Sequence, residues 1–279
     1  MTKIAFQGAF GAYSDMACRE VFPGCETLPC FSFDDAFAAA RDGAADMAMI
    51  PIENSVAGRV ADVHRLLPEG KLHIIGEHYH PIKHHLLAVK GAKIEDIKTV
   101  ESHVMALAQC RKWLRNRNIK SVVHADTAGA AEKISKMGDK YVGAIASELA
   151  GGVYGLQSLA ADIADGANNT TRFLILARDP VAPSLDVSCI TTMLFTVRSV
   201  PAALYKALGG FATNGVNITK LESYLVGGSF TAAQFYIDVE GHPEQDSLRL
   251  ALDELAFFAR EVRVLGTYPA HKFREEHSS

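Results

Sequence analysis

Short apolar runs alternate with helically spaced segments through residues 1–178, and no other feature of the sequence constrains the fold as strongly. The strand-like runs lie at 3–6, 45–52 and 72–75, and the helical spacing falls at 14–22, 34–41 and 56–67. Where strands and helices alternate, the strands usually form a mostly parallel sheet that the helices cover. The sequence therefore predicts α/β units over this part of the chain.

An extended stretch at 77–89 interrupts the alternation, and the same pattern then resumes. Helices are expected at 105–115 and 127–136, with strand-like runs at 120–124 and 144–146. The stretch near 77–86 is suited to carry the chain from one lobe to a second, and its return is expected near 155–172. We therefore expect two α/β lobes with a ligand between them.

Two prolines and a charge pair without periodicity mark residues 178–184 as a linker. Beyond it the expected order is βαββαβ, the ferredoxin-like plan, with a turn at Gly227 and Gly228 between the middle strands. The expected domains are residues 1–180 for the two-lobed part, 181–187 for the linker, 188–270 for the βαββαβ module and 271–279 for a polar tail.

Composition excludes several classes of function. Hydrophobic residues make up 48% of the chain, and the net charge of −4 comes with scattered lysines and arginines, so no nucleic-acid or membrane-surface footprint is present. No apolar run is long enough to cross a bilayer, and no export signal precedes the first strand. Five cysteines without a CxxC pair indicate free thiols in a reducing compartment, so we expect a cytoplasmic protein.

Five polar motifs lie at junctions between expected strands and helices or at the start of a strand. They are QGAFGAYSDMA at 7–17, IPIENSVAG at 50–58, ESHVMALAQC at 101–110, DTAGAA at 126–131 and NNTTRF at 168–173. Each taken singly is equally well explained by a turn or a helix cap. The glycines of the first motif do not follow the GxGxxG spacing, so a dinucleotide site is not expected.

The motifs supply hydroxyls, amides and helix N-termini, but no defensible Ser/His/Asp order, no P-loop and no metal-ligand spacing. His78 and His80 would share one face of a strand, while His84 and His85 would point to opposite faces. Solvated or hydrogen-bonded histidines are the expected explanation, so we expect neither a metal nor a cofactor. Such a site suits a small anion whose own chemistry drives the reaction.

Taken together, the motifs GxxGxYS, PIENS, SHxxALxQC, DTAxAA and NxTRF, followed by a βαββαβ module, resemble the prephenate dehydratase family along essentially the whole chain. The resemblance implies two lobes like those of type 2 periplasmic binding proteins, with the active site in the cleft. It also implies that the C-terminal module is an ACT domain, a small-molecule-sensing dimerisation unit. Because the first strand begins at once, no fused chorismate mutase is expected.

The activity implied by the resemblance is conversion of prephenate to phenylpyruvate, water and CO2 in phenylalanine biosynthesis. The family pattern assigns the hydroxyl donor to Thr171, with Glu53 and Asn54 as orienting residues. Arg172 either holds a substrate carboxylate or braces the loops by ion pairing. The residues implied for substrate binding are Ser55, Ser102, Gln109 and Thr127.

The resemblance further implies phenylalanine as an allosteric effector, bound between ACT modules of a homodimer or homotetramer. The residues implied for this site are Pro201, Ala202, Ala203, Leu204, Asn217, Leu221, Glu222 and Ser223. Relatives often carry glycine where this chain has Ala202 and arginine where it has Tyr224, so retained regulation by phenylalanine is a separate question from catalysis.

Two other functions are compatible with the sequence. Arogenate dehydratase would use the same mechanism on the amino analogue of prephenate, and the sequence does not separate the two substrates. A non-catalytic amino-acid-sensing protein would share the lobes of solute receptors. The complete NxTRF motif and the absence of an export signal argue against this second alternative.

Overall fold

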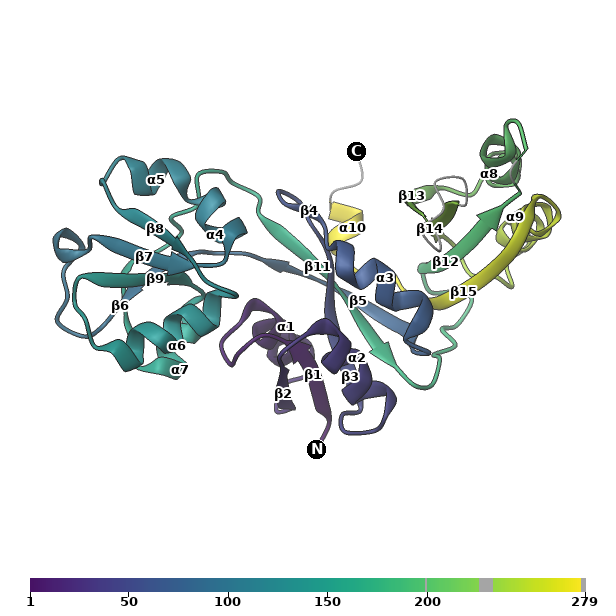
Figure 1. Ribbon diagram of the computed structural model, residues 1–279. Coiled ribbons are helices and arrows are strands. Elements are labelled where there is room, and N and C mark those ends of the chain that lie inside the picture. The colour runs from purple at the N-terminus through teal and green to yellow at the C-terminus, as the bar shows by residue number, and fades with distance from the viewer. Residues whose placement is uncertain (199, 226–232, 277–279) are drawn as a thin grey trace. The chain divides into compact units, whose positions relative to one another are not determined.

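The computed structural model describes residues 1–198, 200–225 and 233–276 of the 279-residue chain. The chain forms two compact units, one of residues 1–66 with 78–174 and one of residues 67–77 with 175–279. Strands β5 (His73–Pro81) and β11 (Thr170–Ala177) each contribute residues to both units. Figure 1 traces the chain through these elements.

The first lobe is built on a sheet with the strand order β2-β1-β3-β11-β5. Strands β1 (Lys3–Gln7), β2 (Glu26–Cys30) and β3 (Met47–Asn54) pair in parallel, with helices α1 (Tyr13–Val21) and α2 (Phe33–Arg41) in the connections. Fully buried residues such as Ile4, Phe6 and Ile50 explain the continuous apolar runs, because helices cover a parallel sheet on its faces.

The helix expected at 56–67 was partly wrong, since the chain first makes a hairpin. The Asn54 side-chain oxygen accepts hydrogen bonds from the backbone N–H groups of Val56 and Ala57, and Gly58 has a φ of 81°. This turn pairs the short strand β4 (Gly58–Arg59) with β3. Helix α3 therefore begins only at Ala61 and runs to Glu69.

The second lobe has the strand order β10-β6-β9-β7-β8. Its strands are β6 (His85–Ala88), β7 (Thr99–Ser102), β8 (Lys120–Val123), β9 (Val142–Ala146) and β10 (Gln157–Ala160). Its helices are α4 (Val104–Gln109), α5 (Arg111–Arg115), α6 (Thr127–Met137) and α7 (Glu148–Tyr154), with a 3-10 turn at Ile94–Asp96. The single helix expected at 105–115 is interrupted at Cys110, whose ψ of 15° ends α4.

The chain passes from the first sheet to the second between β5 and β6 and returns between β10 and β11. The returning strand β11 inserts between β3 and β5, so two crossings join the lobes. This confirms the expected two-lobed α/β plan. The lobes also touch where Ser147 of the second donates to the Gly11 carbonyl of the first.

Beyond residue 188 the order βαββαβ is confirmed, with β12 (Cys189–Val197), α8 (Ala203–Thr213), β13 (Ile218–Leu225), β14 (Ala233–Glu240), α9 (Asp246–Phe258) and β15 (Ala259–Pro269). The antiparallel sheet has the order β13-β14-β12-β15, and α8 and α9 lie together on it (Figure 1). The turn expected at Gly227 and Gly228 lies outside the described residues. The expected polar tail includes a short helix, α10 (Phe273–Glu276).

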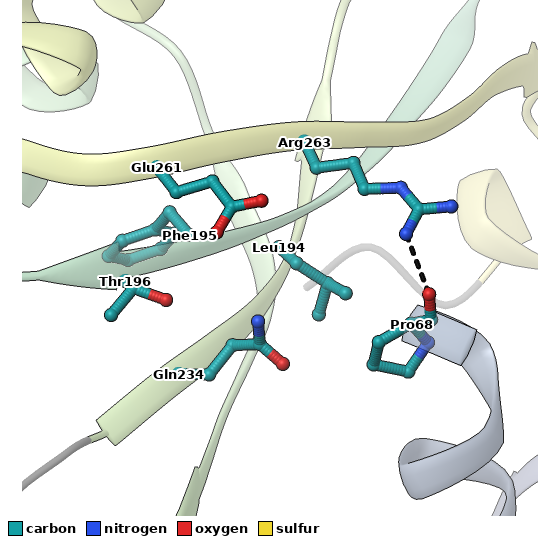
Figure 2. A pocket seen from close by; sticks show the side chains of 7 residues that line it. All are labelled: Pro68, Leu194, Phe195, Thr196, Gln234, Glu261 and Arg263. Atoms are coloured by element: carbon teal, nitrogen blue, oxygen red, sulfur yellow. Dashed lines mark hydrogen bonds between the residues drawn. The ribbon is translucent and has the colours of Figure 1, made fainter. Parts of the chain in front are cut away.

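Residues 67–77 pack with this C-terminal sheet in the second unit. Figure 2 shows one contact, in which Arg263 Nη1 donates to the Pro68 carbonyl oxygen at 2.6 Å. The cavity beside it has a volume of about 100 Å³ and is lined by Pro68, Leu194, Phe195, Thr196, Gln234, Glu261 and Arg263. Gly266 lies so close to Ile74 that a Cβ atom there would be 2.0 Å from the Ile74 carbonyl oxygen.

Among the described helices, none combines the length and the apolar character that crossing a bilayer requires.

Candidate active site

A cleft of about 550 Å³ opens in the first unit and is lined by residues of both lobes. Its lining residues from the sequence motifs are Gln7, Gly8, Ala12, Tyr13, Ser14, Pro51, Asn54, Ala57, His103, Met105, Ala106, Gln109, Asp126, Thr127, Thr171 and Phe173. All five motifs therefore meet at one place. The described side chains that line the cleft include no lysine or arginine, so an anion would be held by hydroxyls, amides and backbone N–H groups.

Thr171 is the second residue of β11; it is 9% exposed and lines the cleft. Its hydroxyl oxygen accepts a hydrogen bond from Asn54 Nδ2 at 2.9 Å. No described group accepts the hydroxyl hydrogen of Thr171. The side chain is thus held by an incoming hydrogen bond, and its own proton is available to a ligand in the cleft.

The orientation of the Asn54 amide follows from its backbone contacts. Its Oδ1 atom accepts the N–H groups of Val56 at 3.0 Å and Ala57 at 2.8 Å. Its Nδ2 atom must therefore face the opposite way, where it donates to the Asn169 side chain at 2.7 Å as well as to Thr171. The turn that begins the β3–β4 hairpin thereby fixes the direction of the hydrogen bond that Thr171 receives.

The hydrogen bonds continue from Asn169 into the second lobe. Asn169 Nδ2 donates to Gln109 Oε1 at 3.0 Å, and the same oxygen is 2.7 Å from His84 Nε2. Because Gln109 Oε1 can only accept, Nε2 of His84 carries the hydrogen. His84 Nδ1 lies 2.8 Å from the Tyr13 hydroxyl, whose single hydrogen is shared between that nitrogen and the Lys83 carbonyl oxygen at 2.9 Å. A network of hydrogen bonds therefore joins Tyr13 to Thr171 across the cleft, and its donors converge on Gln109 Oε1.

Burial favours the uncharged forms of the titratable side chains in this hydrogen-bond network. It lowers the pKa of His84 below its usual value, although Gln109 and Asp162 oppose the shift. It raises the pKa of Tyr13 well above its usual value. His103, which lines the cleft and accepts the Met105 N–H, also has its pKa lowered by burial. These three side chains thus act as neutral donors and acceptors near neutral pH, and the carboxylates of Asp34, Asp62 and Asp126 line the same cleft.

Several residues implied by the family pattern lie behind the cleft rather than on its wall. Arg172 is 2% exposed, and its Nη1 atom is 2.9 Å from Glu53 Oε1. Ser55 donates to the Asn168 carbonyl at 2.7 Å and accepts the Thr170 N–H at 3.0 Å. Their hydrogen bonds hold the NNTTRF segment against β3.

The other two implied binding residues differ in position. Ser102 is fully buried, and its hydroxyl donates to the Ile145 carbonyl at 2.6 Å, so its side chain joins β7 to β9. Thr127 begins α6 and lines the cleft, and the Asp126 side chain caps that helix through the Gly129 N–H. Of the residues expected to bind substrate, Gln109 and Thr127 thus reach the cleft.

Sequence reasoning did not assign a role to Tyr13, His84 or Asn169. Tyr13 and Asn169 lie inside motifs that were recognised, but their side-chain partners are distant in sequence. His84 lies in the extended stretch between the lobes, where the sequence pattern does not indicate which side chains face a ligand. Only the crossing of the chain between the two sheets brings these three side chains to one cleft.

The lobes, the cleft and its oriented neutral donors define a small-molecule enzyme of the two-lobed α/β class. Residues 4–181 match the family model described as prephenate dehydratase. The chain is 50% identical over 274 residues to a bifunctional N-acyl-homoserine lactone acylase/prephenate dehydratase of Komagataeibacter europaeus. The match covers 98% of this chain and 98% of that relative. It is 43% identical over 281 residues to arogenate dehydratase/prephenate dehydratase 1 of Arabidopsis thaliana, covering 96% of this chain and 72% of that one.

A solved structure of prephenate dehydratase from Arthrobacter aurescens, in complex with L-Phe, is also similar. It has a TM-score of 0.89 and 32% identity, and the match covers 96% of this chain and 90% of that one. The chain described here therefore belongs to the prephenate dehydratase family.

Proposed function

We propose that this chain converts prephenate to phenylpyruvate, water and CO2, and that Thr171 donates the hydrogen bond to the departing hydroxyl. The observation that carries the proposal is the Thr171 hydroxyl itself. It lines the cleft, accepts from Asn54 and keeps its own hydrogen for a ligand. Membership of the family supports the reaction, and this geometry supports the role of the residue.

The reaction needs little covalent help from the protein. As the ring carboxylate of prephenate leaves as CO2, the electron pair of its C–C bond enters the ring. The pair of the C–O bond then departs with the hydroxyl oxygen, which takes up one proton and leaves as water. Aromatisation drives the step, so a positioned hydrogen-bond donor at the leaving oxygen and a poorly solvated carboxylate are sufficient.

The cleft meets both requirements. Apolar side chains such as Phe33, Ile82 and Phe173 line it and would surround the ring, where a carboxylate is less well hydrated than in water. The N-terminal ends of α1 and α6 also border it, and free N–H groups in a first helical turn favour carboxylates. Arg172, paired with Glu53 behind the cleft, is the brace for the Thr171 strand in this mechanism.

The test is phenylpyruvate formation by the purified full chain with prephenate as substrate. We expect turnover without added metal or cofactor. A folded protein that leaves prephenate unchanged would contradict the proposal, and a protein that binds prephenate without turnover would favour the alternative of a non-catalytic sensor.

Arogenate is the second candidate substrate, supported by the relatives named arogenate dehydratases. Arogenate carries an ammonium group where prephenate carries a keto oxygen. Asp62 at the start of α3 lines the cleft and offers a carboxylate for such a group. Paired kcat/KM values for the two substrates, on wild type and Asp62→Asn, decide between them: a loss confined to arogenate would assign Asp62 to the ammonium.

An N-acyl-homoserine lactone acylase activity is a further candidate, and the 50% identity to a bifunctional relative over nearly the full length of both chains favours it. Release of fatty acid from an N-acyl-homoserine lactone by the same preparation tests it. A Thr171→Val variant measured in both assays would reveal whether the two activities share the hydroxyl.

We also propose that the βαββαβ module is an ACT domain that binds phenylalanine, as the L-Phe complex of the Arthrobacter aurescens relative suggests. A concavity of about 520 Å³ at the start of α8 is lined by Val197, Arg198, Val200, Pro201, Ala202, Ala203, Leu204 and Tyr205. The first turn of α8 presents N–H groups to a carboxylate there. Asn217, Leu221, Glu222 and Ser223 lie on or beside β13 and would contribute from a second copy in a homodimer or homotetramer.

Ala202 adopts the left-handed conformation, with a φ of 59°, at the position where relatives often have glycine. The backbone shape expected of that loop is thus kept without glycine, which supports retained binding. Calorimetric titration with phenylalanine, on wild type and Asn217→Ala, tests this. No binding heat at millimolar phenylalanine, together with unaltered kinetics, would limit the module to dimerisation.

A further inference from the structure

Glu20, His78 and His80 bring three potential metal ligands to one point of the first unit, apart from the residues that line the cleft. His78 and His80 lie two residues apart on β5, so their side chains leave the same face of the strand. Glu20 lies in the last turn of α1. Its Oε2 atom is 3.0 Å from His78 Nε2 and 2.8 Å from His80 Nδ1, and the three atoms lie within 4.8 Å of one another.

We propose that these three side chains form a binding site for a divalent transition-metal ion such as Zn²⁺, Co²⁺ or Ni²⁺. Two imidazoles and one carboxylate are a ligand set that such ions accept, and imidazole is a poor ligand for Mg²⁺ or Ca²⁺. Ligands about 2.1 Å from an ion and at right angles to each other are about 3.0 Å apart. The two nitrogen-to-oxygen distances, 3.0 and 2.8 Å, match those between neighbouring ligands of one ion.

The surroundings give the site one rigid side and one open side. His80 is 2% exposed and the His78 side chain 15%, so packing holds both rings in place. The Glu20 side chain is 47% exposed, which leaves a route for the ion and room for water molecules to complete its coordination. An open site with three protein ligands binds less tightly than a closed site with four.

The buried His80 Nε2 atom has no hydrogen-bond partner among the described residues. A neutral His80 ring would donate from Nδ1 to Glu20, and its Nε2 atom would keep an unpaired lone pair. With an ion on Nδ1, Nε2 carries an unpaired hydrogen instead. Binding therefore creates no additional unpaired atom, but the usual acceptor behind a ligating histidine is missing, which limits the affinity.

An ion at this point would tie the end of α1 to β5. The other end of α1 contributes Tyr13 and Ser14 to the cleft, and the rings of Tyr13 and His80 are 6.2 Å apart. The proposed ion therefore restrains an element of the cleft wall from outside it. Catalysis as proposed above does not require the ion, so the two proposals stand or fall separately.

The test is titration of the untagged, metal-free full chain with Co²⁺, followed by calorimetry and by visible absorption. We expect one equivalent to bind with a dissociation constant in the micromolar range. The spectrum should lack a thiolate-to-cobalt band, because the free cysteines lie outside the cluster. His80→Gln and Glu20→Gln should each weaken binding about tenfold to a hundredfold, whereas His73→Gln, on the same strand but outside the cluster, should not.

Unfolding temperatures measured without metal establish that each variant is folded. Co²⁺ at a concentration near the wild-type dissociation constant should raise the unfolding temperature of wild type and of His73→Gln more than that of His80→Gln. A cluster that only forms hydrogen bonds would give no binding at millimolar Co²⁺. That result, or binding that is equal in wild type and His80→Gln, would overturn the proposal.

Discussion

The Thr171 hydroxyl accepts one hydrogen bond, from Asn54 Nδ2, and its own hydrogen has no acceptor among the described residues. In Thr171→Val we expect the fold to persist, because Asn54 Nδ2 keeps its bonds to Asn169 and to the Thr170 carbonyl. Turnover should fall about a hundredfold or more, the usual scale for a positioned proton donor. Thr171→Ser, which restores a hydroxyl, should recover most of the loss. Near-wild-type turnover in folded Thr171→Val would remove the assigned role.

The lowered pKa values of His84 and His103 predict a dependence of stability on pH. Each group binds its proton more weakly in the folded chain than in the unfolded one, where the pKa is about 6.5. The free energy of unfolding that depends on the neutral rings is therefore fully present above about pH 6.5. It is lost as the pH falls from there through the folded pKa values. One such group contributes a slope of up to about 1.4 kcal/mol per pH unit.

Thermal unfolding between pH 7 and 5 measures this slope. His84→Gln should flatten the curve, and His73→Gln, at a partly buried histidine outside the cleft, provides the comparison. Identical slopes in wild type and His84→Gln would mean that the buried ring is already charged when the chain folds.

The sequence predicted some of the residues that line the cleft and not others, because a motif does not determine the direction of its side chains. Thr171, Asn54, Gln109 and Thr127 stand in local patterns, and all four line the cleft. Ser102 stands in an equally good pattern, yet its hydroxyl faces the Ile145 carbonyl. A motif locates the backbone position, but the direction of a side chain depends on strands that pair from distant parts of the sequence.

At the scale of elements, the loop between β1 and α1 shows why a glycine is needed. Gly11 has a φ of 83°, and a Cβ atom there would lie 2.6 Å from the Cα atom of Ala150 on α7. Gly24 has nearly the same φ, 81°, with no neighbour within 4 Å of such an atom. Replacing Gly24 by alanine would therefore measure the free-energy cost of the backbone conformation alone. Replacing Gly11 would add the free-energy cost of the steric clash with Ala150.

We expect Gly24→Ala to cost about 1 kcal/mol of unfolding free energy and Gly11→Ala at least about 2 kcal/mol more. Gly11→Ala should also lower activity, because the loop carries Ala12 and Tyr13 into the cleft. Urea unfolding of both variants gives the comparison. Equal losses would mean that α7 moves away freely, and the contact between the lobes would then not position the cleft.

Element types were predicted better than their bounds. Helix α6 agrees with the expected 127–136 almost to the residue, because Asp126 caps its start and Gly138 ends it in the left-handed conformation. The expected helix at 56–67 failed at its first turn, where the Asn54 side chain satisfies the backbone N–H groups of Val56 and Ala57 and favours a hairpin. Side-chain hydrogen bonds to the backbone thus set the start of α6 where it was expected and moved the start of α3 to Ala61.

At the scale of the whole molecule, the division into units bears on the expectation that residues 1–180 fold alone. Residues 67–77 belong to the second unit, where Ile74 is 1% exposed and Gly266 lies against its backbone. A fragment ending at 180 lacks β15 and therefore lacks the contact of Gly266 with Ile74. We expect this fragment to convert prephenate without a response to phenylalanine, and to unfold at a lower temperature than the full chain.

Calorimetry and the phenylpyruvate assay on the fragment and the full chain check this. An equal unfolding temperature would mean that residues 67–77 do not depend on the C-terminal sheet. An insoluble fragment would move the boundary of the independently folding part beyond residue 180. The sequence suggested a boundary at the prolines after 178, but it held no sign that an early segment is shared with the later unit.

That shared segment has a consequence for the nascent chain. Ile74 leaves the ribosome about 190 residues before Gly266, the residue of β15 that lies against its backbone, and translation proceeds at about 5–20 residues per second. Ile74 therefore lacks this contact for roughly 10–40 s during every round of synthesis. Over that interval the growing polypeptide presents an apolar stretch that chaperones and other unfinished chains can bind, so yield in the cell depends on translation speed as well as on final stability.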